Sequence, residues 1–186
     1  MIVEIFDKDI AEILTIFCLS PGSRFLRKEL KERTKLNNVN LDNAINTLLN
    51  SKIIKKEKKF LLLDFDYAKD IIQIISKQYK DLRELPLNIY FSVINIIFLL
   101  GKLKNIHVYL FGSYAKLVYK DTSDIDIAIV SDIINEEDKK KLNVSIQKVE
   151  SRYGKKIEIH YFGMNFYKNK KDPIVKEIIK NGIRLI

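Results

Sequence analysis

The sequence predicts two domains: an α+β domain over residues 1–66 and an α/β domain with a mixed sheet over 88–186, joined by a helical connector over 67–87. Two observations predict this division. The first part shows three helical stripes followed by two short apolar runs, whereas apolar strands alternate with helical segments after about residue 105. At 186 residues the chain is long enough for one ordinary domain or two small ones.

The first domain is expected to consist of three helices and a hairpin. Pro21-Gly22 stops the first apolar stripe, and Ser23 is expected to cap the second helix. A lysine-rich turn separates the two short apolar runs, which is typical of a hairpin. These four elements are predicted over 7–20, 24–34, 40–51 and 52–65.

From residue 67 to about 105 two helices are expected, interrupted at Pro86, and the strands of the second domain follow them. Its last helix is bounded by Asp172-Pro173 and Asn181-Gly182, with proline at the first turn and glycine beyond the last. The preceding elements are predicted as strands over 106–111, 125–130 and 155–162, with a helix over 135–152 and a closing strand in the tail IRLI.

Charge and composition restrict the partners and the compartment. A net charge of +9 favours an anionic partner such as nucleotide or nucleic acid. The single cysteine, Cys18, rules out an internal disulfide. The most apolar run, 87–101, is too short for a membrane span and contains polar residues. Because the start of the sequence also resembles no signal peptide, we expect a cytoplasmic protein without membrane association.

The stretch LFGSYAKLVYKDTSDIDIAIV, residues 110–130, carries the first candidate site. Asp124 and Asp126 stand two apart on a predicted strand, so their side chains leave the same face while the isoleucines leave the other. Two neighbouring carboxylates repel unless a cation lies between them, and Mg²⁺ suits such oxygen ligands. The alternative is a turn with incidental acids, because Asp is common where strands begin.

Gly112-Ser113 favours the functional interpretation. A glycine at the end of a strand lets the backbone approach a ligand closely. A helix beginning in SYAKLV would offer free N–H groups to an anion. Ser113 is predicted to add a hydroxyl to a terminal phosphate and Lys116 a positive charge, so one loop would bring together a phosphate site and metal carboxylates.

A third carboxylate lies on a later strand. Glu158 alternates with isoleucines in KIEIHYF and would join the aspartates if its strand pairs beside theirs. Its alternative is a solvated strand charge. His160 shares the Glu158 face under strict alternation, but we expect it to be a hydrogen-bonded strand histidine rather than a catalytic group. A catalytic role is expected even less for His107, which lies in the strand before Gly112.

The stretch FGSYAKLVYKDTSDIDIAIV resembles the nucleotidyltransferase superfamily of the polymerase-beta type, in particular the minimal nucleotidyltransferase domain found in antitoxins. The family pattern is Gly-Ser, about ten residues, Asp-x-Asp and a later acid on another strand. The resemblance covers about residues 88–186, including the closing DPIVKEIIKNGIRLI. The matching positions are Gly112, Ser113, Ser123, Asp124, Asp126 and Glu158. With Lys116, the first three of these are the residues expected to bind the nucleotide.

One departure concerns the residues after the alanine, where the family commonly has Arg-Gly and this chain has Lys116-Leu117. Lysine keeps the charge but lacks the planar, bidentate fork of arginine. Loss of the glycine is expected to narrow the space beside the phosphates. Neither change removes a predicted metal ligand.

The resemblance implies transfer of a nucleoside monophosphate from ATP or another NTP, with pyrophosphate leaving and adenylyl transfer favoured. Two Mg²⁺ ions would stabilise the attacking and leaving oxygens. Asp124 and Asp126 would hold both ions, and Glu158 would complete the one near the acceptor hydroxyl. The resemblance further implies a protein acceptor, such as a HEPN-type toxin paired with an antitoxin of this kind. Transfer to an RNA 3′ end or to a small molecule such as an aminoglycoside stays open.

The order of three helices and a hairpin resembles the winged helix-turn-helix of small prokaryotic regulators, many of which are homodimers. Between Arg24 and Lys59, eleven basic and four acidic residues give a net charge of +7. Wing lysines could meet the phosphates of double-stranded DNA, and asparagines could pair with adenine edges. The candidate DNA-binding residues are Asn40, Asn43, Thr47, Lys55, Lys56, Lys58 and Lys59.

Two alternatives accompany this assignment. The winged helix could instead serve dimerisation or protein contact, since the helix over 40–51 has no basic residue before Lys52. The whole chain could also be a DNA-binding regulator whose nucleotidyltransferase domain senses nucleotide without catalysis. Three carboxylates favour an enzyme, whereas Lys116-Leu117 and the added winged helix favour the regulator.

Overall fold

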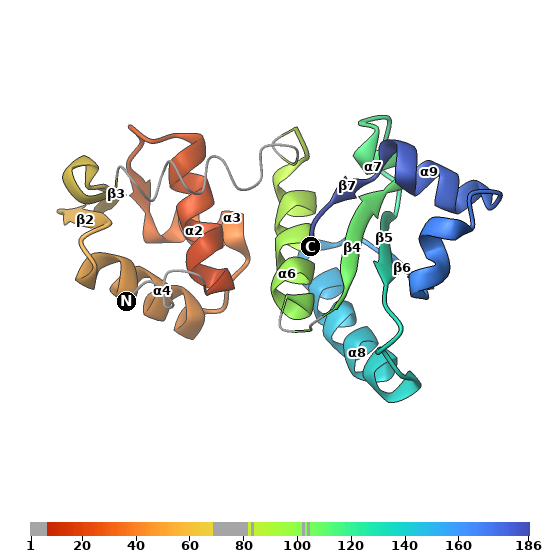
Figure 1. Ribbon diagram of the computed structural model, residues 1–186. Helices are drawn as coiled ribbons and strands as arrows, with labels where there is room; N and C mark the ends of the chain where they lie inside the picture. Colours follow the sequence, from red (N-terminus) through yellow and green to blue (C-terminus); the bar gives the residue numbers. More distant parts are fainter. Residues whose placement is uncertain (1–6, 69–81, 83, 102, 104) are drawn as a thin grey trace. The chain divides into compact units, whose positions relative to one another are not determined.

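The computed structural model describes residues 7–68, 82, 84–101, 103 and 105–186. The chain divides into two compact units, Met1–Lys80 and Asp81–Ile186, which are drawn in Figure 1 and described separately here. Most of the predicted connector over 67–87 lies outside the described residues. The helix expected before Pro86 falls in this part of the chain.

Within residues 7–63 of the first unit, the structure has three helices and a small antiparallel sheet. Asp7 begins the first helix, because its carboxylate accepts a hydrogen bond from the backbone N–H of Asp9 at 2.8 Å. The sheet has the strand order β1-β3-β2, so the hairpin strand β3 lies in the middle. The elements are α2 (Lys8–Leu19), β1 (Phe25–Leu26), α3 (Arg27–Thr34), α4 (Asn38–Asn50), β2 (Ile54–Glu57) and β3 (Phe60–Leu63).

The second helix differs from the prediction at its start. It begins at Arg27, and Ser23 does not cap it. Phe25 and Leu26 instead form a two-residue strand opposite Leu61 and Phe60. The Phe25 ring is buried and lies edge-on to Phe17, with ring centroids 5.2 Å apart. Burial of this aromatic side chain and two ladder positions therefore outweigh a serine cap.

Polar contacts fix how the three helices of the first unit pack. The apolar stripes face inward, with Ile13, Leu30 and Leu41 fully buried. The Arg27 guanidinium binds the Asp42 carboxylate at 2.6 Å and 2.9 Å, joining α3 to α4. The elements lie in the order that the sequence predicts.

The second unit is built on a four-stranded sheet of order β6-β5-β4-β7. Strand β4 runs antiparallel to β5 and to β7, whereas β5 and β6 are parallel, so the predicted mixed sheet is confirmed. The elements are α6 (Leu87–Leu100), β4 (His107–Phe111), α7 (Gly112–Ala115), β5 (Ile125–Val130), α8 (Glu136–Tyr153), β6 (Ile157–Phe162), η2 (Met164–Lys168), α9 (Pro173–Asn181) and β7 (Ile183–Arg184).

Helices α6 and α8 lie together on one side of this sheet (Figure 1). Helix α8 makes the crossover between the two parallel strands, which parallel pairing requires. Side chains that alternate with the candidate site residues, such as Leu110 and Ile127, are completely buried. Across the two helices, the Asn95 amide donates to the Tyr153 hydroxyl at 3.2 Å. Among the described residues, no helix combines the length and apolar character that a membrane span needs.

The opposite face of the sheet is only partly covered. Phe166 of η2 and Val175 and Ile178 of α9 pack against Phe111, Ala128 and Val130 of the sheet. Tyr167 adds a hydroxyl contact of 2.8 Å to Tyr109, and burial together with this bond raises the pKa of Tyr167 to about 12. Because the alternation of β5 and β6 places Asp126, Glu158 and His160 on this same face, the candidate site lies beside an apolar cover.

Candidate active site

Gly112 directly follows β4 and leaves no room for a side chain beside the candidate carboxylate of Asp126. Its φ of +71° lies in the left-handed region that glycine tolerates without cost. Phe111, the last residue of β4, is the register partner of Asp126. A Cβ atom on Gly112 would stand only 2.0 Å from Oδ2 of Asp126. The position therefore needs glycine both for its backbone and for the room that Asp126 occupies.

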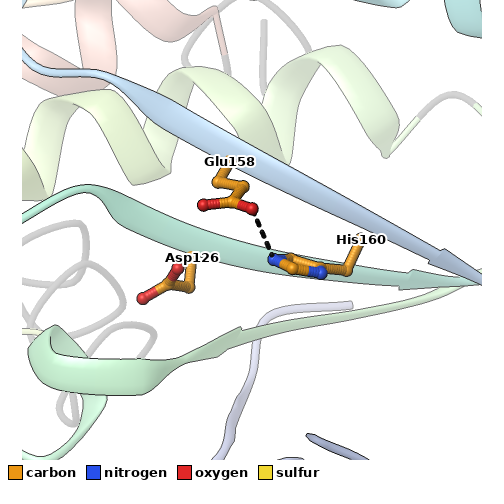
Figure 2. Close-up of side chains that lie close together, drawn as sticks. All are labelled: Asp126, Glu158 and His160. Atoms are coloured by element: carbon orange, nitrogen blue, oxygen red, sulfur yellow. Dashed lines mark ion pairs between the residues drawn. The ribbon is translucent and has the colours of Figure 1, made fainter.

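The parallel register of β5 and β6 gathers three side chains on one face. Asp126 is the partner of Glu158, and Ala128 is the partner of His160. One ligand atom from each of Asp126, Glu158 and His160 lies within 4.8 Å of the other two. Figure 2 shows the Glu158 carboxylate and the His160 ring turned toward each other, with Asp126 beside them on the neighbouring strand. His160 Nε2 lies 3.4 Å from Glu158 Oε1. The strand of Glu158 does pair beside the strand of Asp126, which was the condition for Glu158 to join the aspartates.

The electrostatics of this group favour a bound cation. Partial burial raises the pKa of Asp126, and the negative charge of Glu158 raises it further. Asp124 and Glu177 act in the same direction, while His160 acts against them. A positive ion between Asp126 and Glu158 would remove this repulsion. Two carboxylates and an imidazole are also donor groups that divalent metals bind in proteins.

Asp124 lies outside the group that the sequence predicts it to join. The strand begins at Ile125, so Asp124 stands before the paired region. Its Oδ2 lies 3.5 Å from Nζ of Lys156, and its side chain keeps 36% of its accessible surface. The structure thus brings together Asp126 and Glu158 of the predicted metal ligands and adds His160, while Asp124 faces a lysine.

The predicted phosphate contacts lie on the same loop, but two of them already have partners. Lys116 Nζ lies 2.7 Å from Oε1 of Glu177 on α9. The Ser123 hydroxyl accepts a hydrogen bond from the Lys120 N–H at 2.9 Å and so closes the turn before β5. Ser113 lies in the short helix α7, directly after Gly112.

The sequence did not predict the contact between Lys116 and Glu177 or the nearness of His160 to Asp126. Glu177 stands 61 residues from Lys116, and no local pattern links them. His160 did carry a signal, because it alternates with Glu158 on one strand. This alternation could not place His160 near Asp126 without the parallel pairing of β5 and β6, which sets Asp126 opposite Glu158.

Leu117 occupies the position where the resembled family commonly has glycine, and its backbone still has the conformation that suits glycine. Its φ is +58°, in the left-handed region. A residue with a Cβ pays about 1–2 kcal/mol for this conformation. The leucine side chain remains 44% exposed, so it recovers little by burial.

We therefore expect Leu117→Gly to raise the free energy of unfolding by about 0.5–1 kcal/mol, the relief of strain less the greater chain entropy of glycine. Urea unfolding of the two proteins measures this difference. The control is Val118→Gly, since Val118 is 67% exposed and has an ordinary φ. That variant should lose about 0.5–1 kcal/mol. Equal losses in both variants would contradict strain at Leu117.

The candidate DNA-binding residues of the first unit fall into two groups. Lys55, Lys56, Lys58 and Lys59 are all exposed on the β2–β3 hairpin. On α4, Asn43 is exposed, but the Asn40 amide donates to Asp9 of α2 at 2.9 Å, and the Thr47 hydroxyl donates to the Asn43 carbonyl at 3.0 Å. The four hairpin lysines are thus better placed for an anionic partner than Asn40 or Thr47.

Comparison with known proteins bears on the second unit. Residues 96–185 match a family model described as a nucleotidyltransferase domain. A search of curated proteins found no match to the chain. The matched range includes Gly112, Asp126, Glu158 and His160, and it supports the resemblance of this region to nucleotidyltransferases and hence a transferase in general.

Proposed function

We propose, on the basis of the nucleotidyltransferase domain matched at residues 96–185, that the protein transfers a nucleoside monophosphate from an NTP to an acceptor. The observation that carries the proposal is the carboxylate pair of Asp126 and Glu158, side by side on adjacent strands. Gly112 leaves room for this pair at the end of the phosphate loop. The pair is half-open to solvent, as a substrate site requires.

Asp126 and Glu158 would hold a divalent cation in this reaction, and Asp124 would join them. The pair of Asp124 with Lys156 is long and exposed, and such surface pairs contribute little, so Asp124 is available for a cation. A bound divalent ion supplies charge neutralisation for the phosphates and activates the acceptor hydroxyl.

In the proposed step, the acceptor oxygen forms a bond to the α-phosphorus of the NTP. The bond between that phosphorus and the oxygen bridging to the β-phosphate breaks, pyrophosphate leaves, and the acceptor proton passes to solvent. Positioning and charge neutralisation supply most of the catalysis. Ser113 would bind a phosphate oxygen, and Lys116 would do so by exchanging or sharing its contact with Glu177.

We favour ATP as the donor and a protein as the acceptor, in the manner of an antitoxin that modifies a HEPN-type toxin. This choice rests on the likeness of the Gly-Ser and Asp-x-Asp stretch to minimal nucleotidyltransferases. Transfer to an RNA 3′ end or to a small molecule would use the same carboxylates and is distinguished by the mass of the product.

The test incubates the untagged full chain with ATP labelled at the α-phosphate, a divalent cation and lysate of its own host. ATP labelled at the γ-phosphate is the parallel reaction. We expect a labelled macromolecule from the α-label only, and none with the double variant Asp124→Asn/Asp126→Asn. Label from the γ-phosphate would indicate a kinase and would overturn the proposal, as would equal labelling by the double variant.

A second proposed function concerns the first unit, which we assign to the winged helix-turn-helix class with double-stranded DNA as its partner. The specific observation is the four exposed lysines on the β2–β3 hairpin. This function fits an enzyme that also controls transcription. It fits equally a regulator whose second unit senses nucleotide without catalysis, and the labelling experiment separates the two.

We expect replacement of Lys55, Lys56, Lys58 and Lys59 by alanine to weaken duplex DNA binding by the full chain. The logarithmic salt slope should fall by about 0.9 for each phosphate that a lysine no longer neutralises. The control removes equal charge from exposed lysines of the second unit, Lys168, Lys170, Lys171 and Lys180. Equal weakening in both variants would indicate a general charge effect, and absence of salt-dependent binding by the natural protein would refute DNA binding.

A further inference from the structure

The donor atoms around Asp126 are not all oxygens. Of the three side chains whose ligand atoms lie within 4.8 Å of one another, one is the imidazole of His160. Mg²⁺ strongly prefers oxygen ligands, whereas imidazole suits first-row transition metals such as Fe²⁺ and Zn²⁺. The identity of the third ligand therefore affects which cation the site selects.

The imidazole is held where it can serve a cation. Its Nε2 faces Glu158 at 3.4 Å, and 26% of the side chain is exposed. The ring lies edge-on to Phe111, with centroids 5.2 Å apart and an interplanar angle of 73°. Ala128, the fully buried register partner of His160, has too short a side chain to displace the ring. Apolar contact thus restrains the ring while its Nε2 points at the Glu158 carboxylate (Figure 2).

The contact between His160 and Glu158 does not by itself account for this arrangement. At 3.4 Å it is longer than a normal charge-assisted hydrogen bond, and Glu158 is half-exposed. A carboxylate oxygen of Asp126 also lies within 4.8 Å of the ligand atoms of Glu158 and His160. A divalent cation would satisfy all three side chains at once, which a histidine–glutamate pair does not.

We propose that His160 is a nitrogen ligand of the cation held by Asp126 and Glu158, and that this site prefers a first-row transition-metal ion to Mg²⁺. Mn²⁺ belongs to the first-row series and serves as the paramagnetic probe of the site. The inference deepens the proposed nucleotidyl transfer and rests on it for the use of the cation. It replaces Asp124 by His160 in the primary site and leaves Asp124 for the second cation or for the phosphates.

The chain has only two histidines, which makes the assignment direct. The untagged protein is titrated with Mn²⁺ alone, and free Mn²⁺ is followed by electron paramagnetic resonance. Electron spin-echo modulation of the bound ion then reports a coupled imidazole nitrogen. We expect the nitrogen coupling in the natural protein and in His107→Gln, and its loss in His160→Gln and in His160→Asn.

The affinities give a second readout. Removal of an outer partner of a metal ligand costs 10–100-fold in affinity, so loss of a ligand should weaken Mn²⁺ binding at least tenfold. The affinity for Mg²⁺, measured by its competition with Mn²⁺, should fall less. The ratio of the Mn²⁺ affinity to the Mg²⁺ affinity is therefore expected to be smaller in His160→Gln than in the natural protein. The Asp126→Asn variant shows that the observed ion sits at this site, because it should lose tight Mn²⁺ binding.

The possible results separate this inference from the proposed function. Bound Mn²⁺ without nitrogen coupling in the natural protein overturns the role of His160 and leaves nucleotidyl transfer standing. Nitrogen coupling without any transfer of α-label supports the metal site and counts against the enzyme. Failure to bind either Mn²⁺ or Mg²⁺, with or without ATP, overturns both.

Discussion

Asp126→Asn is expected to lower nucleotidyl transfer by about a thousandfold or more while leaving the protein at least as stable as before. The loss follows from the position of Asp126 between Gly112 and Glu158, where its charge would hold the cation. Metal ions contribute several kcal/mol of charge stabilisation in such reactions, and each 1.4 kcal/mol is about tenfold in rate. Transfer of α-label under single-turnover conditions measures the effect.

The same electrostatics explain why Asp126→Asn should lower activity without lowering the stability of the protein. Burial and the charge of Glu158 raise the pKa of Asp126 in the folded protein. The protonated carboxyl therefore stabilises the fold fully at pH values below the pKa of Asp126 in the unfolded chain, and this stabilisation is lost as the pH rises through the pKa in the folded protein. At neutral pH the ionised carboxylate is therefore unfavourable when no cation is bound. Asparagine keeps the shape and removes the charge, so the melting temperature of the metal-free variant should equal or exceed that of the natural protein.

The control is Asp121→Asn, which makes the same chemical change in the same loop at an exposed position. It should leave both transfer and melting temperature within experimental error. Transfer by Asp126→Asn within tenfold of the natural rate would contradict a metal-holding role. A large loss of stability in Asp126→Asn would show instead that the carboxylate has a structural role.

The strands and helices around this site could be predicted because their signals are local. Isoleucines that alternate on residues 125–130 determine the inward face of β5, and Asp172-Pro173 begins α9 as expected. Gly112 was expected to let the backbone approach a ligand closely, and the structure shows in addition that a side chain there would meet Asp126.

The residues that surround the carboxylates were harder to predict because their contacts connect distant parts of the chain. The nearness of His160 to Asp126 depends on the parallel register of two strands that α8 separates. The partner of Lys116 is a glutamate on α9, 61 residues away. Similarly, Phe25 leaves its expected helix because it pairs with Leu61 of the hairpin. Strand register and helix docking are decided by packing of the whole domain, which single-sequence patterns do not contain.

Gly112→Ala is expected to lower transfer about a hundredfold while the fold is retained. The added Cβ would stand 2.0 Å from Oδ2 and 2.8 Å from Cγ of Asp126, so this carboxylate must leave its present position beside Glu158. A displacement of about 1 Å in a catalytic group can cost about a hundredfold. The φ of +71° adds about 1–2 kcal/mol of strain for alanine. Transfer of α-label and urea unfolding measure the two effects.

Gly154→Ala separates the two effects, because Gly154 has nearly the same φ, +68°, but a Cβ there would meet nothing within 4 Å. Both variants should lose about 1–2 kcal/mol of unfolding free energy from the left-handed backbone. Only Gly112→Ala should also lose transfer and Mn²⁺ affinity. If the two variants lose activity equally, strain alone accounts for the loss and Asp126 is not displaced. If Gly112→Ala keeps full activity, the close approach of Gly112 to Asp126 has no part in the reaction.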